Sequence, residues 1–345
     1  MFQSLFSFTA SAVKLPFLPL SLGAARVLPI EQDKKRMPAL VKELPPPSKF
    51  YPSIHPQVDY VSAEVDNYFL QHWPFRSEKE RVKFRAAGFS RVTCLYFPLA
   101  TDDRIGFACR MLTVLFLIDD LLEEMGLDEG SEYNEKLISI SRGEIPPDRN
   151  IPVEWIMHDL WEDMKAYDAS LGEQTMEPVF TFMRAQTDKS RLTIHQLGEY
   201  LEYREKDVGQ ALLSALQRYT MKIHLTEEDL RIAAPVELNC AKHIAVLNDI
   251  YSWNKELLAS ETLHHEGAAI CSSVQVISEI AALNHAAAQR VLWTMCREWE
   301  SVHQELVRER EKMQCKRDLL DYIHGLEYQM SGNERWSEST PRYHF

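Results

Sequence analysis

Residues 102–125 read DDRIGFACRMLTVLFLIDDLLEEM, a run without proline that ends just before Gly126. The later turns are apolar around most of the helical circumference, which predicts a buried central helix. The end of the run nevertheless carries a cluster of carboxylates, DDLLEE at 119–124. Moving such groups out of water costs free energy unless a partner compensates. The stretch therefore predicts a helical core that ends at a cation site.

Most of the chain beyond residue 50 shows helical patterning. VDYVSAEVDNYFLQHW (58–73) places apolar residues at mixed three- and four-residue spacing, and segments at 155–171, 194–221 and 237–260 read as further helices. No alternating strand of convincing length and no internal repeat interrupts them. We predict an all-α fold, with one helical domain at 51–345 built around buried central helices. Residues 1–50, which include a PPP run, are predicted to form a flexible extension.

Composition narrows the classes of function. The formal net charge of −13 argues against nucleic acid as a partner, because neutralising phosphates requires clustered Lys and Arg. No uninterrupted apolar run reaches the length of about 18 residues that a transmembrane helix requires. Six cysteines lack CxxC spacing, so we interpret them as reduced core residues rather than as a zinc site or a disulfide framework.

The first 30 residues contain no acidic side chain and carry LPFLPLSLGAA between Lys14 and Arg26. Pro16 and Pro19 break this apolar segment, which makes it a poor secretory signal. We expect an N-terminal extension that carries no targeting signal, and a cytoplasmic protein. Organelle targeting through residues 1–30 is the weaker alternative.

Asp119 and Glu123 are four residues apart, so on a helix they lie roughly 40° apart around the axis. Their oxygens can converge near the C-terminal end of the helix, where their mutual repulsion and the helix dipole both disfavour them. A hard divalent cation reverses that balance, since Mg²⁺ takes carboxylates, waters and phosphate oxygens as ligands. The alternative is a frayed, solvated helix end.

NDIYSWNKE at 248–256 offers a second set of oxygen ligands. Asn248, Ser252 and Glu256 follow i, i+4, i+8 spacing and form one polar stripe after the apolar turns HIAVL. An amide oxygen, a hydroxyl and a carboxylate form a chelating set for a hard cation, with Lys255 beside them. The alternative is an ordinary polar face of an amphipathic helix.

Two further segments carry charged or aromatic side chains of interest. In LEYREKDVG (201–209), Arg204 presents a fork suited to phosphate oxygens, which Asp207 can hold in place. Gly209 can loosen the helix at that point. The tail GLEYQMSGNERWSESTPRYHF (325–345) contains Trp336, Arg342 and Tyr343, which either close over a site or dock on the core.

Taken together, these segments resemble class I terpene synthases. DDLLE at 119–123 and NDIYSWNKE at 248–256 match the aspartate-rich and NSE metal motifs of that family in order and spacing. FSRVTCLYFPLA, FMRAQTD, YLEYREKDVG, NCAKH, MCREWE and GLEYQMSGNE are similar to the fungal aristolochene synthases within the family. The resemblance covers roughly residues 55–345.

The resemblance implies the isoprenoid synthase fold, a helical bundle around a central apolar cavity, and a lyase that cyclises farnesyl diphosphate. It implies passage through germacrene A to an eremophilane-type hydrocarbon, aristolochene, or to another sesquiterpene on the same fold. It also implies three Mg²⁺ ions and a homodimer or homotetramer. The implied roles are metal binding for Asp119, Glu123, Asn248, Ser252 and Glu256; diphosphate binding for Arg204, Lys255, Arg342 and Tyr343; triggering of ionisation for Asp207 and Val208; and lining of the cavity for Tyr96, Phe116, Phe182 and Trp336.

Two departures from the family pattern predict an altered cavity shape. Gly106 stands where relatives carry a larger His, and Trp253 and Asn254 replace a Tyr and an acidic residue inside the NSE motif. We expect these substitutions to affect which product forms more than whether the diphosphate is ionised.

Three other classes remain as alternatives. A chain-elongating prenyltransferase would show a second DDxxD in place of NDIYSWNKE, and a non-catalytic relative would lack a metal ligand. A di-iron helical bundle uses paired ExxH motifs. ETLH (261–264) and ESVH (300–303) fit that pattern, but the first sits in a loop-like stretch and the second on what reads as the charged face of a surface helix.

Overall fold

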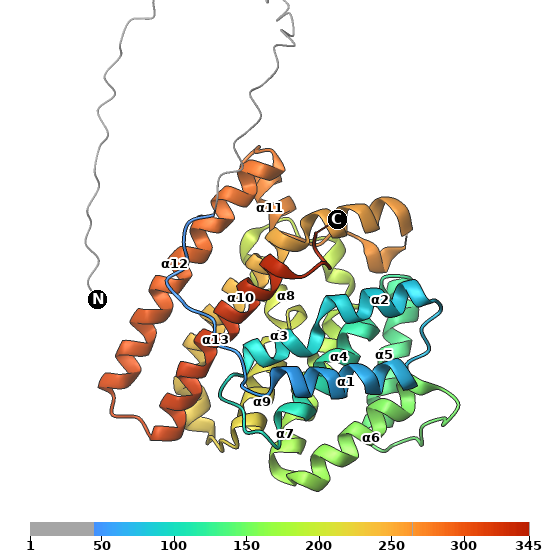
Figure 1. Ribbon diagram of the computed structural model, residues 1–345. Coiled ribbons are helices and arrows are strands. Elements are labelled where there is room, and N and C mark those ends of the chain that lie inside the picture. The colour runs from blue at the N-terminus through green and yellow to red at the C-terminus, as the bar shows by residue number, and fades with distance from the viewer. Residues whose placement is uncertain (1–44, 264, 345) are drawn as a thin grey trace, which may run out of the picture. The chain divides into compact units, whose positions relative to one another are not determined.

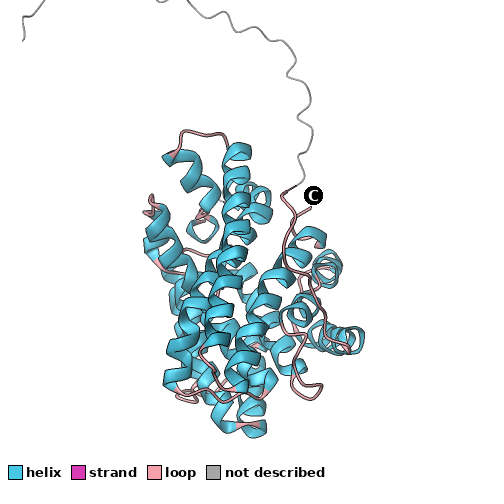
Figure 2. Cartoon of the chain, turned by 90° about the vertical axis from the view of Figure 1, so that its left-hand side faces the viewer, coloured by secondary structure: helices cyan, strands magenta, loops and turns pink. Residues whose placement is uncertain are grey.

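The computed structural model describes residues 45–263 and 265–344, and these are helical with no strand among them (Figures 1 and 2). The all-α prediction is therefore confirmed. Residues 1–44, which hold most of the predicted extension and its targeting alternative, lie outside the described residues. Over the described ranges the helices are α1 (Val58–His72), α2 (Glu78–Ala87), α3 (Phe89–Tyr96), α4 (Ile105–Leu122), α5 (Leu127–Ser141), α6 (Pro152–Tyr167), α7 (Ala169–Ala185), α8 (Leu197–Asp207), α9 (Gln210–Met221), α10 (Glu227–Leu263), α11 (Ser273–Ile280), α12 (His285–Lys312) and α13 (Arg317–Ser339), with short 3-10 turns at Lys189–Leu192 and Glu266–Ala268.

Helix α4 is the buried central helix that residues 102–125 predict. Ile105, Cys109, Met111 and Val114 are fully buried, although they do not share a single face. Because α4 contacts α1, α3, α6 and α9, apolar residues are needed around most of its circumference. The helix ends at Leu122, with Glu123 as its C-cap, so the carboxylate cluster lies at the end of the helix.

Helix α10, the second predicted motif-bearing helix, is 37 residues long and packs against α12 and α13 (Figure 1). Val246, Leu247 and Ile250 on one side of it join a second core cluster with Leu292 and Trp293 of α12. The opposite side of the same turns is left for the polar stripe. The two motifs therefore lie on separate helices, which an ion pair between Lys255 of α10 and Glu123 at the end of α4 connects.

Helix breaks follow local signals in the sequence. The predicted helical segment 155–171 is two helices, because Asp168 turns the chain and its side chain accepts a hydrogen bond from the Leu171 amide at the start of α7. The segment 194–221 is likewise interrupted between α8 and α9, where Gly209 has a φ of 74°. A positive φ of this kind favours glycine.

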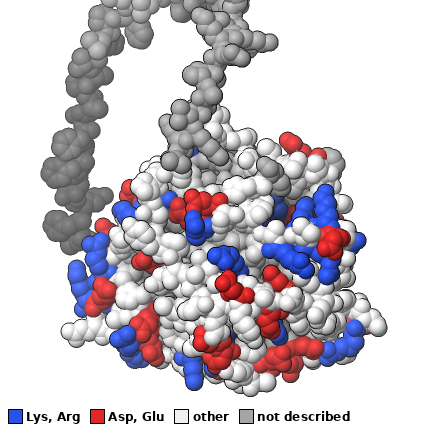
Figure 3. All heavy atoms as spheres, viewed as in Figure 1, with Lys and Arg blue, Asp and Glu red and all other residues white. Residues whose placement is uncertain are grey.

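The surface mixes charges of both signs. In the face shown in Figure 3, basic and acidic side chains are interspersed and form no continuous basic patch. In the described part of the chain, no helix combines the length and hydropathy needed to cross a bilayer.

Helix α13 approaches α3 closely at Gly332, and this contact gives a stability prediction. A Cβ atom at Gly332 would lie 2.7 Å from the Leu95 carbonyl oxygen, so backbone would have to move. We expect Gly332→Ala to lower the free energy of unfolding by about 1–3 kcal/mol, the usual cost of overpacking. Urea titration followed by circular dichroism measures this change.

Gly198→Ala in α8 is the matched control, because nothing lies within 4 Å of the added methyl group. It should leave stability unchanged or raise it by about 0.4–1 kcal/mol, since alanine restricts the unfolded chain. Equal stability of the two variants would contradict the close contact at Gly332.

Candidate active site

One cavity collects every side chain that the sequence predicts for the site. It is bounded by α4, α8, α10, α13 and the segment that follows α13. Its lining includes the predicted residues Tyr96, Phe116, Asp119, Glu123, Phe182, Arg204, Asp207, Val208, Asn248, Ser252, Lys255, Glu256, Trp336, Arg342 and Tyr343.

The inner part of the cavity is aromatic and aliphatic. The ring centroids of Phe116 and Trp336 lie 5.9 Å apart at an interplanar angle of 39°. The Tyr96 hydroxyl donates to Asn333 Oδ1 at 2.9 Å, and burial raises the pKa of Tyr96, which keeps the phenol neutral. Aliphatic side chains complete this wall: Leu112, Leu115, Leu212, Leu213 and Ile244.

The carboxylates of α4 form one side of the cavity rim. An oxygen of Asp119, one of Asp120 and one of Glu123 all lie within 4.8 Å of one another. Burial, followed by repulsion from Glu123, raises the pKa of Asp119 to about 6. Such crowding of carboxylates is relieved when a divalent cation binds them.

The polar stripe of α10 forms the facing side of the rim. Ser252 Oγ donates to Glu256 Oε1 at 2.6 Å, so the i, i+4 spacing brings the two groups together as predicted. Burial, followed by the charge of Asp249, raises the pKa of Glu256 to about 7. With Asn248, these side chains offer amide, hydroxyl and carboxylate oxygens, a donor set that fits Mg²⁺.

Cationic side chains already neutralise part of the α4 rim. Arg342 donates to Asp120 Oδ1 at 2.7 Å and reaches Asp119 Oδ2 at 3.5 Å, and Lys255 pairs with Glu123. Burial opposes ionisation of Asp120, but Arg342 outweighs it and holds the pKa of that carboxyl below its usual range. The acidic rim of α4 is thus bridged to α10 and to the C-terminal segment.

The α10 stripe is paired in the same way. Arg204 donates to Asn248 Oδ1 at 2.8 Å and also pairs with Asp207, while Asn248 Nδ2 donates to the Tyr343 hydroxyl at 2.8 Å. The four side chains predicted to bind diphosphate are therefore each bonded to a predicted metal ligand. A metal and a diphosphate that arrive together could exchange these partners without leaving a buried charge unpaired.

The helix break expected near Val208 is present. Helix α8 ends at Asp207, Val208 follows with non-extended backbone, and Gly209 turns the chain into α9. A Cβ atom at Gly209 would lie 3.1 Å from the Phe182 ring, so any other residue would also crowd that ring. The break keeps Arg204 and Phe182 on the same cavity.

Asp249 supports the site from behind, and sequence reasoning did not single it out. Its carboxylate is fully buried and accepts hydrogen bonds from the Tyr200 hydroxyl at 2.5 Å and from Ser273 Oγ at 2.6 Å, while Oδ1 lies 3.2 Å from Arg204. It thereby fixes the Arg204 guanidinium relative to α10. Its position directly after Asn248 was the only local signal.

Gln186 and Asp120 were also missed. Gln186 Nε2 donates to Asp119 Oδ1 at 3.0 Å from the end of α7, and no spacing rule connects these two positions. Asp120 was visible in DDLLE, but its partner Arg342 lies far away in the sequence. Both residues orient groups at the rim.

The residues of the two departures from the family pattern do not line the cavity, and the altered cavity shape expected from them stays a prediction. Trp253 packs against His285 at 4.5 Å between centroids, because it follows Ser252 and therefore points roughly 100° away around α10. A Cβ atom at Gly106 would have Glu64 of α1 as its neighbour at 3.9 Å.

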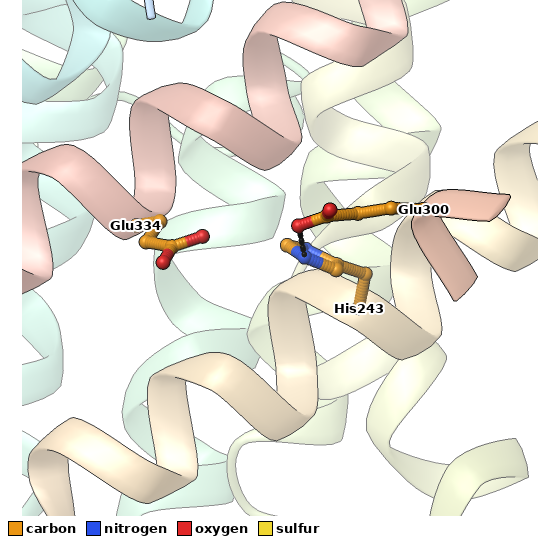
Figure 4. Close-up of side chains that lie close together, drawn as sticks. All are labelled: His243, Glu300 and Glu334. Carbon is orange, nitrogen blue, oxygen red and sulfur yellow. Dashed lines mark ion pairs between the residues drawn. The ribbon is translucent and has the colours of Figure 1, made fainter. Parts of the chain in front are cut away.

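A second cluster of possible metal ligands lies outside the cavity. His243 of α10 points toward Glu300 of α12, with Glu334 of α13 nearby (Figure 4). Arg297 donates to Glu334 at 2.5 and 2.9 Å and also pairs with Glu300. A guanidinium thus already neutralises both carboxylates, so this cluster is an ion-pair network that joins α12 to α13.

The Glu and His of the ESVH motif are buried, so the assignment of these two side chains to a charged surface face is wrong. Glu300 and His303 have no exposed surface. Glu300 accepts hydrogen bonds from Ser48 Oγ at 2.8 Å and the Lys49 amide at 2.7 Å, and the His303 ring lies 5.6 Å from that of Phe50. These contacts give Glu300 a structural role and remove the support for a di-iron site. His264 of ETLH lies outside the described residues.

Known proteins are similar to this chain over most of its length. A family model for terpene synthase family 2, C-terminal metal binding, matches residues 110–301, which include both motifs. The chain is 58% identical over 300 residues to an aristolochene synthase of Aspergillus terreus, covering 87% of this chain and 94% of the relative. It is 52% identical over 337 residues to an aristolochene synthase of Penicillium roqueforti, covering 97% and 98%.

Solved structures of terpene synthases have the same fold as this chain. The crystal structure of aristolochene synthase from Penicillium roqueforti matches with a TM-score of 0.77 at 54% identity, covering 86% of this chain and 100% of that one. Hedycaryol synthase in complex with HEPES matches with a TM-score of 0.70 at 19% identity, which shows the shared fold alone. The expectation drawn from the motifs is confirmed, and the chain belongs to the terpene synthase family.

Proposed function

We propose that this protein is a sesquiterpene cyclase that converts farnesyl diphosphate to aristolochene and releases diphosphate. The observation that carries the proposal is a single cavity with two chemically distinct parts. The rim gathers oxygen ligands and cationic donors, and the interior is apolar and aromatic. An isoprenyl diphosphate has the same division between a charged head and a hydrocarbon chain. The aristolochene synthases among its relatives support the choice of product.

The rim residues would bind the head group. Asp119 and Glu123 on α4, and Asn248, Ser252 and Glu256 on α10, are the side chains that would hold three Mg²⁺ ions. When bound, Mg²⁺ neutralises the diphosphate and makes it a better leaving group. Arg204, Lys255, Arg342 and Tyr343 would donate hydrogen bonds to its oxygens, giving up their present partners on the two helices.

Ionisation breaks the bond between the allylic carbon and the diphosphate oxygen, and the electron pair leaves with the diphosphate. Asp207 would orient Arg204 as Arg204 binds the negatively charged diphosphate. The helix break at Val208 would transmit the resulting shift of Arg204 toward Phe182. The apolar wall keeps water from quenching the cation. The faces of Phe116, Phe182 and Trp336 attract it without offering a nucleophile.

The shape of the wall would fold the chain so that the distal double bond attacks the cationic carbon. A ten-membered ring forms and loses a proton to give germacrene A. Reprotonation, hydride and methyl shifts and a final proton loss then give the bicyclic eremophilane skeleton. A different sesquiterpene from the same cavity is the second candidate, because small differences in the wall redirect the cation.

Incubation of the purified full chain with farnesyl diphosphate and Mg²⁺ tests this function. We expect a C15 hydrocarbon and diphosphate, with the hydrocarbon identified as aristolochene by gas chromatography with mass spectrometry and by NMR. EDTA should reduce turnover to background, and excess Mg²⁺ should restore it, because the carboxylates need the cation to bind the head group.

The possible outcomes separate the reaction from the product. No volatile product from farnesyl or geranyl diphosphate would overturn the cyclase assignment. A C15 hydrocarbon other than aristolochene would retain the cyclase and replace the product. Turnover that persists in EDTA would remove the proposed role of the rim oxygens.

A further inference from the structure

Phe89 lies directly behind the cavity wall at the corner between α2 and α3. The corner is formed by Gly88, whose φ of 65° ends α2 and lets α3 begin at once in a new direction. Phe89 is buried, with 2% of its surface exposed, and it does not itself line the cavity. Its importance therefore depends on what it contacts.

The Phe89 ring contacts both parts of the proposed site. It stacks on Phe116, with ring centroids 4.5 Å apart and an interplanar angle of 10°. The guanidinium carbon of Arg342 lies 5.5 Å from the centroid of the same ring. Arg342 bonds to Asp120 at the rim, whereas Phe116 faces the apolar interior. One buried ring thus joins the place where the diphosphate would be held to the wall that would face the cation.

The backbone of the same corner holds the C-terminal segment. The carbonyl oxygen of Ala87 accepts hydrogen bonds from Trp336 Nε1 at 2.9 Å and from Thr340 Oγ1 at 3.1 Å. Trp336 in turn packs against Phe116 and against Tyr343. The aromatic wall and the segment that carries Arg342 are therefore anchored to one short turn.

We propose that Phe89 is a positioning residue that sets the orientation of Phe116 and the placement of Arg342 together. The inference rests on the proposed cyclase function and deepens it. The stack restricts how the Phe116 ring can turn, so its face stays toward the cavity. The cation–π contact holds the Arg342 guanidinium above a buried surface while it bonds to the rim. Loss of the ring would loosen both at once.

Phe89→Leu in the full chain tests this coupling, with Phe84→Leu as the matched control. Phe84 is also buried, and its ring contacts are with Phe69, Phe75 and Phe89. Both substitutions remove the same volume from the same aromatic cluster. Only the first removes a ring that contacts Phe116 and Arg342.

We expect Phe89→Leu to raise KM roughly three- to tenfold, from the loss of the contact with Arg342. It should also raise severalfold the share of products that leave the cavity early, such as germacrene A, because the Phe116 face is no longer fixed. Calorimetric titration with inorganic diphosphate in Mg²⁺ should show a matching fall in affinity. Phe84→Leu should lower the melting temperature while leaving KM and the product ratio as in the wild type.

Unchanged KM and product ratio in Phe89→Leu would overturn the inference, as would an equal shift in Phe84→Leu. If Phe89→Leu does not fold, Phe89→Met carries the same comparison, since it fills the space without a ring. The wild-type chain assayed in parallel separates the two proposals. Failure of the wild type to form a C15 hydrocarbon would overturn the cyclase function itself.

Discussion

Replacement of Asn248 by alanine is expected to lower kcat with farnesyl diphosphate by about a thousandfold while leaving the fold intact. The amide oxygen of Asn248 belongs to the donor set of α10 and accepts from Arg204 at 2.8 Å. Alanine removes one oxygen ligand of the Mg²⁺ that would stabilise the departing diphosphate, and losing one such electrostatic interaction typically costs about 10²- to 10³-fold in kcat. Gas chromatography of the hydrocarbon product measures the change.

The cost to folding should be small by comparison. Asn248 makes hydrogen bonds to Arg204 and Tyr343, and such bonds contribute about 1 kcal/mol each. We therefore expect the helical circular dichroism spectrum to be retained and the melting temperature to fall by only a few degrees, on the order of 2–4 °C per kcal/mol.

Asn254→Ala is the control for this experiment. Asn254 lies on the same helix but is exposed and does not line the cavity. It should keep wild-type turnover. Full activity of Asn248→Ala, or an equal loss in Asn254→Ala, would remove Asn248 from the metal site.

Replacement of Arg342 by glutamine is expected to weaken the binding of inorganic diphosphate in Mg²⁺ by roughly 10- to 100-fold, the usual worth of a hydrogen bond to a charged group. Only 11% of the Arg342 side chain is exposed, and its guanidinium bonds to Asp120 and reaches Asp119. Glutamine keeps some hydrogen-bonding ability but loses the charge and the planar fork. Isothermal titration calorimetry gives the two affinities directly.

Arg335→Gln provides the comparison, because Arg335 lies in α13 close to the same segment but is 59% exposed and pairs only with Glu338 among the ion pairs of the described residues. Its affinity for diphosphate should match that of the wild type. An Arg342→Gln variant that binds diphosphate as tightly as Arg335→Gln would show that the present pairing of Arg342 with the carboxylates is structural only.

The resting arrangement explains why both effects are expected to be large. Arg342, Lys255 and Arg204 are each held by a predicted metal ligand or its neighbour. A buried ion pair that loses one partner leaves an uncompensated charge, which is strongly unfavourable. Substrate and cations that enter together would replace both partners at once. In the proposed function, the rim would therefore exchange one set of ion pairs for another.

Part of this site could be predicted because it is local. Asn248, Ser252 and Glu256 share one face of a helix by spacing alone, and Asp119 and Glu123 do the same on another helix. The meeting of these two helices with Arg342 does not follow from spacing, and it was expected only from the family resemblance. The structure places all of these side chains on one cavity.

Other features depended on which face of a helix meets which neighbour. Trp253 is next to Ser252 in sequence, but it packs in a separate core against His285 and does not line the cavity. The charged ESVH pattern is typical of a surface helix. In the structure its Glu300 is instead bonded to Arg297, Ser48 and Lys49. Packing partners decide such cases, and they come from distant parts of the chain.

The all-α class, the buried helix at 102–125 and the two stripes of oxygen-bearing side chains follow from local sequence, because helical periodicity acts over one or two turns. The anchoring of Arg204 by Asp249, and the contacts that join Phe116 to Arg342 through Phe89, depend on tertiary packing. These contacts bring together residues from different helices. They exist because the chain closes on itself around the cavity, which no local pattern can encode.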